Sequence, residues 1–341
     1  MKNLCYFYRS VLIKKLYEMA ILEFDLKKSY FDIPYDVISK PHKLVPLPDI
    51  EHFYRQLAAC KKADKQDPML MLAQKYNVIP LGHLKNWLLS GQDVSMSIMR
   101  LANMLKLIQS NAQSQVVIVK DQIGWRIHIK GVAIDVIQYE SVRAAIGMLN
   151  ILRYFFGESF TPNKLCLSGY CHERDQKQYR DLFQCDIQWH QPRTEMWFDR
   201  AMAFSKSSVA FEDSYSNYQM GVDDLDRYFN MPDPLNKVQG IISTIAYQRH
   251  YRLPRLVDVA QKWGWSDQQL SRFLRQKQVS FSQLRSLVLA NEAITMLQKG
   301  VDIEQVRHRL GYENQVSFTN MFKSMKGMTP KQYQQRFVSE R

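Results

Sequence analysis

Apolar residues recur at helical spacing in the amino-terminal part of the chain, and the windows that follow this period predict four amphipathic helices. None of these windows is long enough for a coiled coil. The predicted helices lie near residues 50–62, 81–90, 94–111 and 141–156.

Strand patterns lie between these helices. The clearest is VVIVKDQIGWRIHIKG, which reads as a hairpin: a β-branched run, a turn that ends at Gly124, and a second run. The second run alternates between two faces, with Trp125, Ile127 and Ile129 on one and Arg126, His128 and Lys130 on the other. Shorter strands are predicted at 165–168, 187–190 and 195–198. The region is therefore predicted to be a mixed α/β domain.

The carboxy-terminal pattern differs, because short amphipathic windows are separated by capping residues and glycine turns. Pro254 suits a first helical position, and Ser266 with Gln269 has the spacing of a capping box, as does Ser280 with Gln283. Later signals for helix starts and ends are Asp302, Gly311, Gly327, Thr329, Pro330 and Gln332. Six or seven short helices are predicted, one of them near 240–251.

Two of the turns in this region repeat the same residue types. The copies are Trp263, Gly264 and Trp265, and Leu310, Gly311 and Tyr312. Leu270 and Leu274 follow the first turn and Phe318 and Phe322 follow the second, as apolar anchors four residues apart. A helix, a glycine turn and a seated second helix form a helix-turn-helix. An ordinary αα-hairpin is the alternative, but the duplication and the polar outer faces favour DNA binding.

Composition and charge refine this interpretation. The 341 residues are 46% hydrophobic, so the chain can bury at least one core. Of the formal net charge of +13, residues 235–341 supply +10, with 17 Lys and Arg against 7 Asp and Glu. Clustered positive charge favours a polyanion, because each neutralised phosphate releases counterions. A solvated basic face kept for solubility is the alternative that charge alone leaves open.

The remaining sequence limits location and chemistry. No apolar run approaches the roughly 20 residues needed to cross a bilayer, so we expect a cytoplasmic protein without a membrane partner. The CHERDQ segment begins like a zinc-protease helix, but Gln176 stands where a second histidine is required. The spacing of Cys166, Cys171, His172, Cys185 and His190 matches no paired-ligand pattern. We therefore expect no catalytic residues, metal or cofactor, and the cysteines to be reduced thiols.

A composition change separates the two regions. Residues 205–236 are rich in Ser, Asp, Asn and Pro, and five acidic residues lie between Glu212 and Asp226. This pattern predicts a linker with at most one short helix. The predicted organisation is a mixed α/β domain at 1–204, the linker at 205–236, and an all-α domain at 237–341 with helix-turn-helix units at about 254–278 and 302–327.

Both regions of the sequence resemble a known family, the carboxy-terminal region more strongly. The segment from SFSQLRSLVL through GVDIEQVRHRLGYENQVSFTNMFKSMKGMTPKQYQQRF is similar to the signature of AraC/XylS transcriptional regulators, over about the last hundred residues. Residues 25–204 resemble, more weakly, the amino-terminal domain of the subgroup that contains the ornithine-utilisation regulator. The resemblance implies that this domain senses a small molecule and mediates self-association, and that RNA polymerase is a partner. Arg307 departs from the family, which usually has a small residue there, and Leu289 replaces a frequent arginine.

The resemblance also implies that the second helix of each unit enters a major groove. Asn and Gln suit adenine, arginine suits guanine, and a hydroxyl can donate or accept. The predicted base-reading residues are Gln268, Ser271, Arg272, Gln315, Ser317, Thr319 and Asn320. Arg275 and Lys323 are predicted to contact phosphates, which position the protein without reading sequence. For each of these side chains, a solvated surface position is the alternative.

The sequence thus predicts a regulator that binds promoter DNA as a homodimer and responds to an effector of unknown site and identity. A constitutive DNA-binding protein whose first domain only dimerises is one alternative, and an enzyme fused to a DNA-binding module is another. A pocket for the effector should be mostly apolar with a few polar groups. Arg126 and His128 could contribute to it, but exposed strand residues are the favoured interpretation of both.

Overall fold

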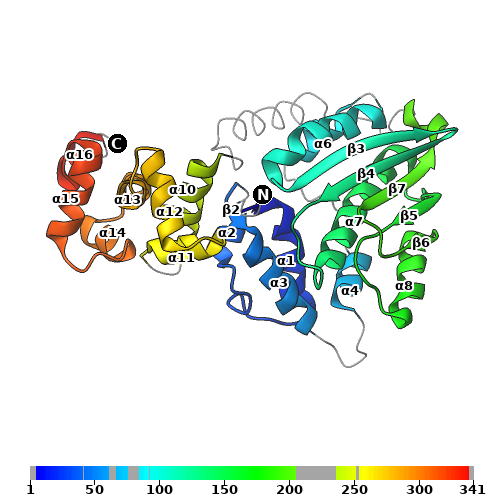
Figure 1. The fold of residues 1–341 in the computed structure, drawn as a ribbon, viewed down its shortest axis with the longest axis horizontal. Helices are drawn as coiled ribbons and strands as arrows, with labels where there is room; N and C mark the ends of the chain where they lie inside the picture. Colours follow the sequence, from blue (N-terminus) through cyan, green and yellow to red (C-terminus); the bar gives the residue numbers. More distant parts are fainter. Residues whose placement is uncertain are drawn as a thin grey trace. The chain divides into compact units, whose positions relative to one another are not determined.

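The computed structural model describes residues 5–40, 42–60, 67–75, 84–91, 93–204, 236–250 and 253–337. The chain divides into two units (Figure 1). One spans residues 6–232, and the other spans residues 233–341 together with residues 1–5. The predicted linker lies outside the described residues, apart from Asn236. The predicted fold class is confirmed: the first unit is mixed α/β and the second is all-α.

The first unit mixes helices with short strands. Its elements are β1 (Phe7–Arg9), α1 (Val11–Glu23), α2 (Tyr35–Ile38), β2 (Leu44–Pro46), α3 (Leu47–Ala59), α4 (Pro68–Lys75), α5 (Leu84–Leu89), α6 (Val94–Ile108), β3 (Ala112–Val119), β4 (Gln122–Ile129), α7 (Ile137–Phe156), β5 (Lys164–Cys166), α8 (Glu173–Phe183), β6 (Ile187–Gln188), β7 (Thr194–Asp199) and the 3₁₀ helix η1 (Arg200–Phe204). All five cysteines are free thiols, four of them buried. Among the described residues, no helix is both long and apolar enough to span a membrane.

The five-stranded sheet of this unit has the order β3-β4-β7-β5-β6. Its neighbouring strands are antiparallel, except for the parallel pair of β5 and β6. Trp125 of β4 lies opposite Val116 of β3 and Met196 of β7, and its side chain is fully buried. Helix α7 packs against β7, as Figure 1 shows. Helix α7 and the sheet therefore share one apolar core. The apolar face of β4 that the sequence predicted contributes Trp125 and Ile127 to this core.

The predicted hairpin is confirmed, but the predicted position of its turn is wrong. β3 and β4 pair from Ala112 with Ile129 to Val119 with Gln122, so the turn lies before Gln122 and not at Gly124. Gly124 is inside β4, opposite Trp197 of β7. A Cβ atom at Gly124 would lie 2.8 Å from the Trp197 ring. The glycine therefore marks a close approach of a side chain to the strand, a role that glycine also has in strand interiors.

The predicted helices are present with shifted ends, as α3, α5, α6 and α7, although residues 61–62 and 81–83 of the predicted ranges lie outside the described residues. Four helices of this unit, α1, α2, α4 and α8, were not predicted. In α1 the sequence VLIKKLYEMAILE is apolar on most sides, and Ile13, Leu16 and Tyr17 are buried. A helix that is buried on several sides has a weak helical period, which explains why the pattern did not indicate it.

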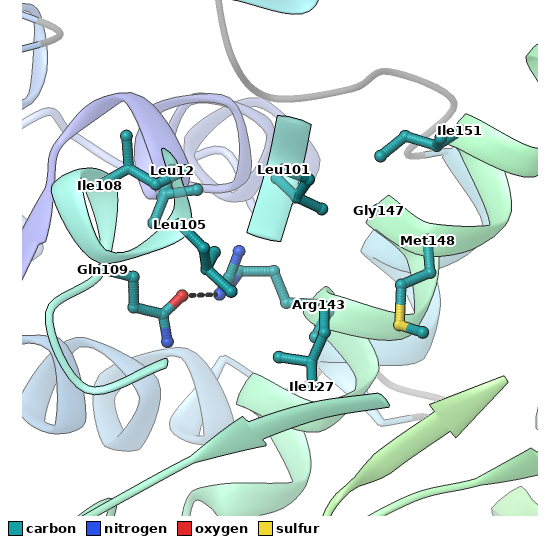
Figure 2. Close-up of a pocket in the computed structure, with 11 residues that line it drawn as sticks. Leu12, Leu101, Leu105, Ile108, Gln109, Ile127, Arg143, Gly147, Met148 and Ile151 are labelled. Atoms are coloured by element: carbon teal, nitrogen blue, oxygen red, sulfur yellow. Dashed lines mark hydrogen bonds between the residues drawn. The ribbon is translucent and has the colours of Figure 1, made fainter. Parts of the chain in front are cut away.

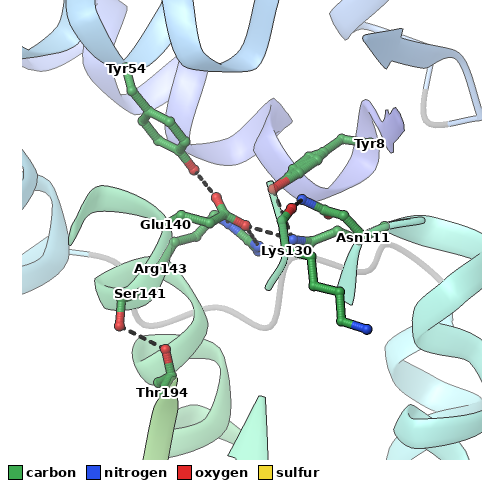
Figure 3. Close-up of polar contacts among 9 residues, drawn as sticks. Tyr8, Tyr54, Asn111, Lys130, Glu140, Ser141, Arg143 and Thr194 are labelled. Atoms are coloured by element: carbon green, nitrogen blue, oxygen red, sulfur yellow. Dashed lines mark hydrogen bonds and ion pairs between the residues drawn. The ribbon is translucent and has the colours of Figure 1, made fainter. Parts of the chain in front are cut away.

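A buried polar cluster joins α3, the end of α6 and α7 (Figure 3). The Glu140 carboxylate accepts hydrogen bonds from the Tyr54 hydroxyl at 2.5 Å and from Gln109 Nε2 at 2.9 Å. Arg143, one turn along α7, forms an ion pair with the same carboxylate. Burial alone would raise the pKa of Glu140, but Arg143 and these hydrogen bonds outweigh it and hold the pKa below its ordinary value. Buried charges are tolerated where they are paired and hydrogen-bonded in this way.

Seven helices follow one another in the described part of the second unit. They are α10 (Lys237–Gln248), α11 (Leu256–Lys262), α12 (Asp267–Gln276), α13 (Phe281–Gln298), α14 (Ile303–Arg309), α15 (Gln315–Lys326) and α16 (Pro330–Phe337). The predicted role of Pro254 is wrong, because α11 begins at Leu256 with Arg255 as its N-cap residue. Both predicted capping boxes are confirmed, at the starts of α12 and α13.

Candidate nucleic-acid interface

The first helix-turn-helix unit consists of α11, a glycine turn and α12. Gly264 has a φ of +62°, a backbone conformation that glycine adopts without steric cost. The backbone amide of Trp265 donates to the carbonyl of Ala260 at 2.9 Å and closes the turn. Leu270 and Leu274 are buried on α12. The predicted anchors therefore seat the second helix, and the α12 face opposite to them is exposed.

The second unit repeats this construction with α14 and α15. Gly311 has a φ of +78°, and the Tyr312 amide donates to the carbonyl of Arg307 at 3.2 Å, the bond equivalent to that of Trp265. Phe318 and Phe322 are fully buried. Both units have the backbone hydrogen bond between residues five apart, and both have the pair of buried anchors. These shared features confirm that the two units are copies.

Helix α13 connects the two units and supplies part of the core under the second. Leu289, which replaces the frequent arginine of the family, is fully buried there. It lies in one cluster with Ala293, Leu297 and the anchor Phe318. An arginine at this depth would require a charged partner, so the leucine agrees with the apolar packing of this chain.

The predicted base-reading side chains lie on the outer faces of α12 and α15. Five of them, Gln268, Arg272, Gln315, Ser317 and Asn320, are exposed. Ser271 and Thr319 are half-buried, and both predicted phosphate contacts, Arg275 and Lys323, are exposed. On ideal helical spacing, Arg272 lies opposite the buried Leu270 and Leu274, and Asn320 lies opposite Phe318 and Phe322. The structure therefore leaves five of the seven predicted base-reading side chains exposed, with Arg272 and Asn320 opposite the buried anchors.

These cations differ from others in the same unit. Arg255 pairs with Asp258, and Arg249 pairs with Glu292 at 3.1 Å. Within the described part of the chain, Arg272, Arg275 and Lys323 have no ion pair. Their charges therefore remain available to an external anion, which is the property that phosphate binding requires.

Val316 is an exposed apolar residue on the outer face of α15 that is not among the predicted base-reading residues. Its side chain is 69% exposed in the first turn of α15. It precedes Asn320 by four residues, so the two share one helix face. The apolar feature of the major groove is the thymine methyl group. The available signal was an isolated valine on an otherwise polar face, at the position that corresponds to Gln268 in the first copy.

Arg307 occupies the position that is the small, buried Ala260 in the first copy. It is only 7% exposed, and its guanidinium reaches the turn. Nη1 donates to the carbonyls of Tyr312 and Glu313, each at 2.6 Å, and Nη2 donates to Glu304 at 2.6 Å. Nε is the atom of this group that finds no partner among the described residues. The arginine thus keeps the helix-turn-helix geometry by bonding the turn that leads into α15.

Comparisons with known proteins agree with this geometry. Residues 259–336 match the family model described as a helix-turn-helix domain. Residues 30–205, more than half of the chain, match the model described as the arabinose-binding domain of AraC transcription regulators. The chain belongs to the AraC family of transcription regulators.

Individual relatives of this AraC-family chain are distant. It is 31% identical over 118 residues to the urease operon transcriptional activator of Escherichia coli, and the match spans 34% of this chain and 39% of that protein. The transcriptional regulator CdpR from Pseudomonas aeruginosa is 15% identical with a TM-score of 0.44, over 95% of this chain and 98% of that one. A DNA-binding transcriptional dual regulator from Escherichia coli K-12 is 26% identical with a TM-score of 0.28, over 30% and 90%.

Proposed function

We propose that this AraC-family chain is a regulator of transcription that binds double-stranded promoter DNA through α12 and α15. The observation that carries the proposal is the duplication of the helix-turn-helix, with both outer faces exposed and polar. In each unit the buried anchors hold the second helix against the domain and leave its outer face exposed, so each helix can enter a major-groove segment. Two units in one domain then read two successive segments.

Residue types on the two faces support different roles within this function. Arg272 suits a bidentate contact with guanine, and Asn320 suits adenine. Arg275 and Lys323, farther along the two helices, suit phosphates and fix the register without reading bases. Val316 adds an apolar contact for a thymine methyl group. The positive balance of the carboxy-terminal region adds affinity that does not depend on sequence.

The test requires a known site, which mapping of the genomic positions bound by the full chain supplies. Affinity for that site and for a scrambled duplex is then measured at several salt concentrations, for the unmodified chain and for Arg272→Ala and Asn320→Ala. Thr295→Ala, exposed on α13, is the matched control. We expect the two interface variants to lose preference for the mapped site and the control to keep it. Equal affinity of the unmodified chain for mapped and scrambled DNA would contradict sequence-specific binding.

We also propose that residues 1–204 sense a small molecule and join two copies of the chain, that 205–236 link the domains, and that RNA polymerase is the partner at the promoter. The α/β architecture and the match of residues 30–205 to an arabinose-binding domain model support the sensing role. A ligand regulates only through its differential affinity for two states. The mass of the full chain in solution tests self-association, and its DNA affinity with and without metabolites tests sensing. We expect both roles to operate in the cytoplasm, as the sequence predicts.

A further inference from the structure

A pocket lies inside the first unit, between α1, α6, β4 and α7 (Figure 2). Its cavity volume is about 50 Å³, and the space between its walls continues out to solvent. Its walls are apolar, with Leu101 and Leu105 from α6, Ile127 from β4 and Ile151 from α7. Its polar lining consists of Gln109 and Arg143. Apolar walls with very few polar groups are the usual composition of a small-molecule site.

The Arg143 guanidinium presents one unused donor to this pocket. Nε donates to Glu140 at 3.1 Å, and Nη2 donates to Glu140 and to Gln109 Oε1, the latter at 2.8 Å. Nη1 donates to no atom in the described part of the chain. Arg143 is more than nine-tenths buried, and Figure 2 shows its second terminal nitrogen pointing away from Gln109, among the leucines that line the pocket. Nη1 is not among the buried side-chain atoms without a partner, so water can reach it through the pocket. A ligand oxygen in the pocket would replace that water as the acceptor for Nη1.

Gln109 cannot add a donor of its own. Both hydrogens of its Nε2 are used, because this atom donates to the Tyr8 hydroxyl and to Glu140, each at 2.9 Å. Its Oε1 accepts from Arg143. The polar end of the pocket therefore provides the two N–H groups of Arg143 Nη1 as donors, so it suits a ligand that carries a hydrogen-bond acceptor.

Gly147 provides part of the open space. It lies in the interior of the 20-residue helix α7, and a Cβ atom built there meets nothing within 4 Å. Glycine at such a position costs about 1 kcal/mol relative to alanine, so its presence calls for a reason other than helix stability. No backbone conformation requires it, since its φ is not in the left-handed region. The missing side chain instead leaves the pocket unfilled beside Arg143, one turn away.

We propose that this pocket binds a small, uncharged, mainly apolar molecule that carries one hydrogen-bond acceptor, such as a ketone, an aldehyde or a lactone, and that Arg143 Nη1 binds its oxygen. The proposal deepens the sensing role and rests on it. Charge selects this class: Glu140 already neutralises Arg143, so a second carboxylate would add an uncompensated negative charge to a buried site. A sugar is equally unsuited, because its many hydroxyl groups would find a single donor and apolar walls.

The experiment follows the thermal unfolding midpoint of the full chain in the presence of four probes of similar size. They are cyclohexanone, the lactone δ-valerolactone, cyclohexanecarboxylate and L-arabinose. A compound that binds only the native state raises the midpoint with its concentration. We expect cyclohexanone and the lactone to raise it, and the carboxylate and the sugar to leave it unchanged. Equal or larger shifts with the carboxylate or the sugar would overturn the ligand class.

Two substitutions at Gly147 locate the site. Ala and Leu have nearly equal helix propensity, so Gly147→Ala and Gly147→Leu both remove the cost of the glycine, but only the leucine fills the pocket. We expect Gly147→Leu to abolish the shift by cyclohexanone, and Gly147→Ala to keep most of it. An unliganded midpoint at or above that of the unmodified chain shows that each variant folds. If the leucine variant kept the full shift, the compound would bind elsewhere and the proposal would fail.

The failure of this inference can be told from the failure of the sensing role. If no probe stabilises the chain but another metabolite changes its DNA affinity by fivefold or more, the sensing role stands and the pocket assignment is wrong. If no metabolite changes DNA affinity and none stabilises the chain, both are wrong. If cyclohexanone stabilises the chain through the pocket without any change in DNA affinity, the site is real and its regulatory role is refuted.

Discussion

Replacing Arg307 by alanine isolates the contribution of one side chain to the second helix-turn-helix. The substitution gives the second copy the residue that the first copy has at Ala260, so it does not add bulk to the contact between α14 and the turn. It removes two hydrogen bonds of 2.6 Å from Nη1 to the carbonyls of Tyr312 and Glu313, and also the bond from Nη2 to the exposed carboxylate of Glu304. The variant therefore tests whether the turn into α15 depends on the guanidinium.

The expected magnitude follows from these contacts. Hydrogen bonds from a charged donor contribute roughly 1.5–3 kcal/mol each, so the pair is worth about 3–6 kcal/mol before offsets. The buried Nε of Arg307 lacks a partner among the described residues, and its removal returns about 1–3 kcal/mol. Both carbonyls can bond to water in the variant, because Tyr312 is half-buried and Glu313 is exposed. The net local destabilisation should then be about 2 kcal/mol, or on the order of 30-fold in the population of the opened turn.

Amide hydrogen exchange on the full chain measures this opening, and the first copy serves as an internal reference. The reporters are the amides of Gly311 and Tyr312, which bond to the carbonyls of His308 and Arg307. The reference amides are their equivalents in the first copy, Gly264 and Trp265. Exchange should accelerate at the first pair and stay constant at the second, because local opening depends on local contacts.

Arg307→Lys is the matched control, because lysine keeps the charge but lacks the planar fork that reaches two carbonyls. It should give an intermediate acceleration. Unchanged exchange at Tyr312 in Arg307→Ala would refute the argument that the arginine holds the turn. Equal acceleration in both copies would instead mean that the substitution lowers the stability of the whole unit, which also contradicts a local role.

Four further predictions concern the two units separately. Residues 235–341 alone should bind promoter DNA with an affinity that falls steeply as salt rises, and a titration without binding at low salt would contradict this. Arg272→Ala and Asn320→Ala should each lose about 1–3 kcal/mol of binding free energy for the specific site but little for random DNA. Lys323→Ala should weaken binding to both DNAs and flatten the salt dependence. Equal losses on specific and random DNA would show that Asn320 is not a base-reading residue. Glu140→Leu should destabilise the first unit by about 3–5 kcal/mol in calorimetry, because it leaves a buried arginine unpaired. The pKa of Glu140 is lowered in the folded state, so the stabilisation from its charge is present above the unfolded pKa and is lost as the pH falls through the folded pKa. The stability of Glu140→Gln should therefore be less sensitive to acid. An unchanged dependence of stability on acid pH would contradict a stabilising role for the Glu140 charge.

Local signals determined most of the second unit. Helix starts depend on a side chain and backbone amides within three residues, so the capping boxes at Ser266 and Ser280 were readable from spacing alone. The turn glycines and the apolar anchors are also local, and they predicted both helix-turn-helix units and their outer faces. The exception is Pro254: its allowed backbone angles fit both a first helical position and the extended segment before α11, and spacing cannot separate the two.

Tertiary structure decided what depends on residues far apart in the chain. Gly124 looked like a turn because its real neighbour, the Trp197 ring, lies on another strand. From the sequence, Arg307 was only a departure from the usual small residue, because only the folded turn shows the two carbonyls that its guanidinium reaches. The pocket was predicted only as a class of site, since Arg143 and Gln109 come together from separate helices. Periodicity reports the burial of a residue within its own helix or strand, whereas a hydrogen-bond partner or a cavity is set by the packing of several elements, which no single stretch of sequence contains.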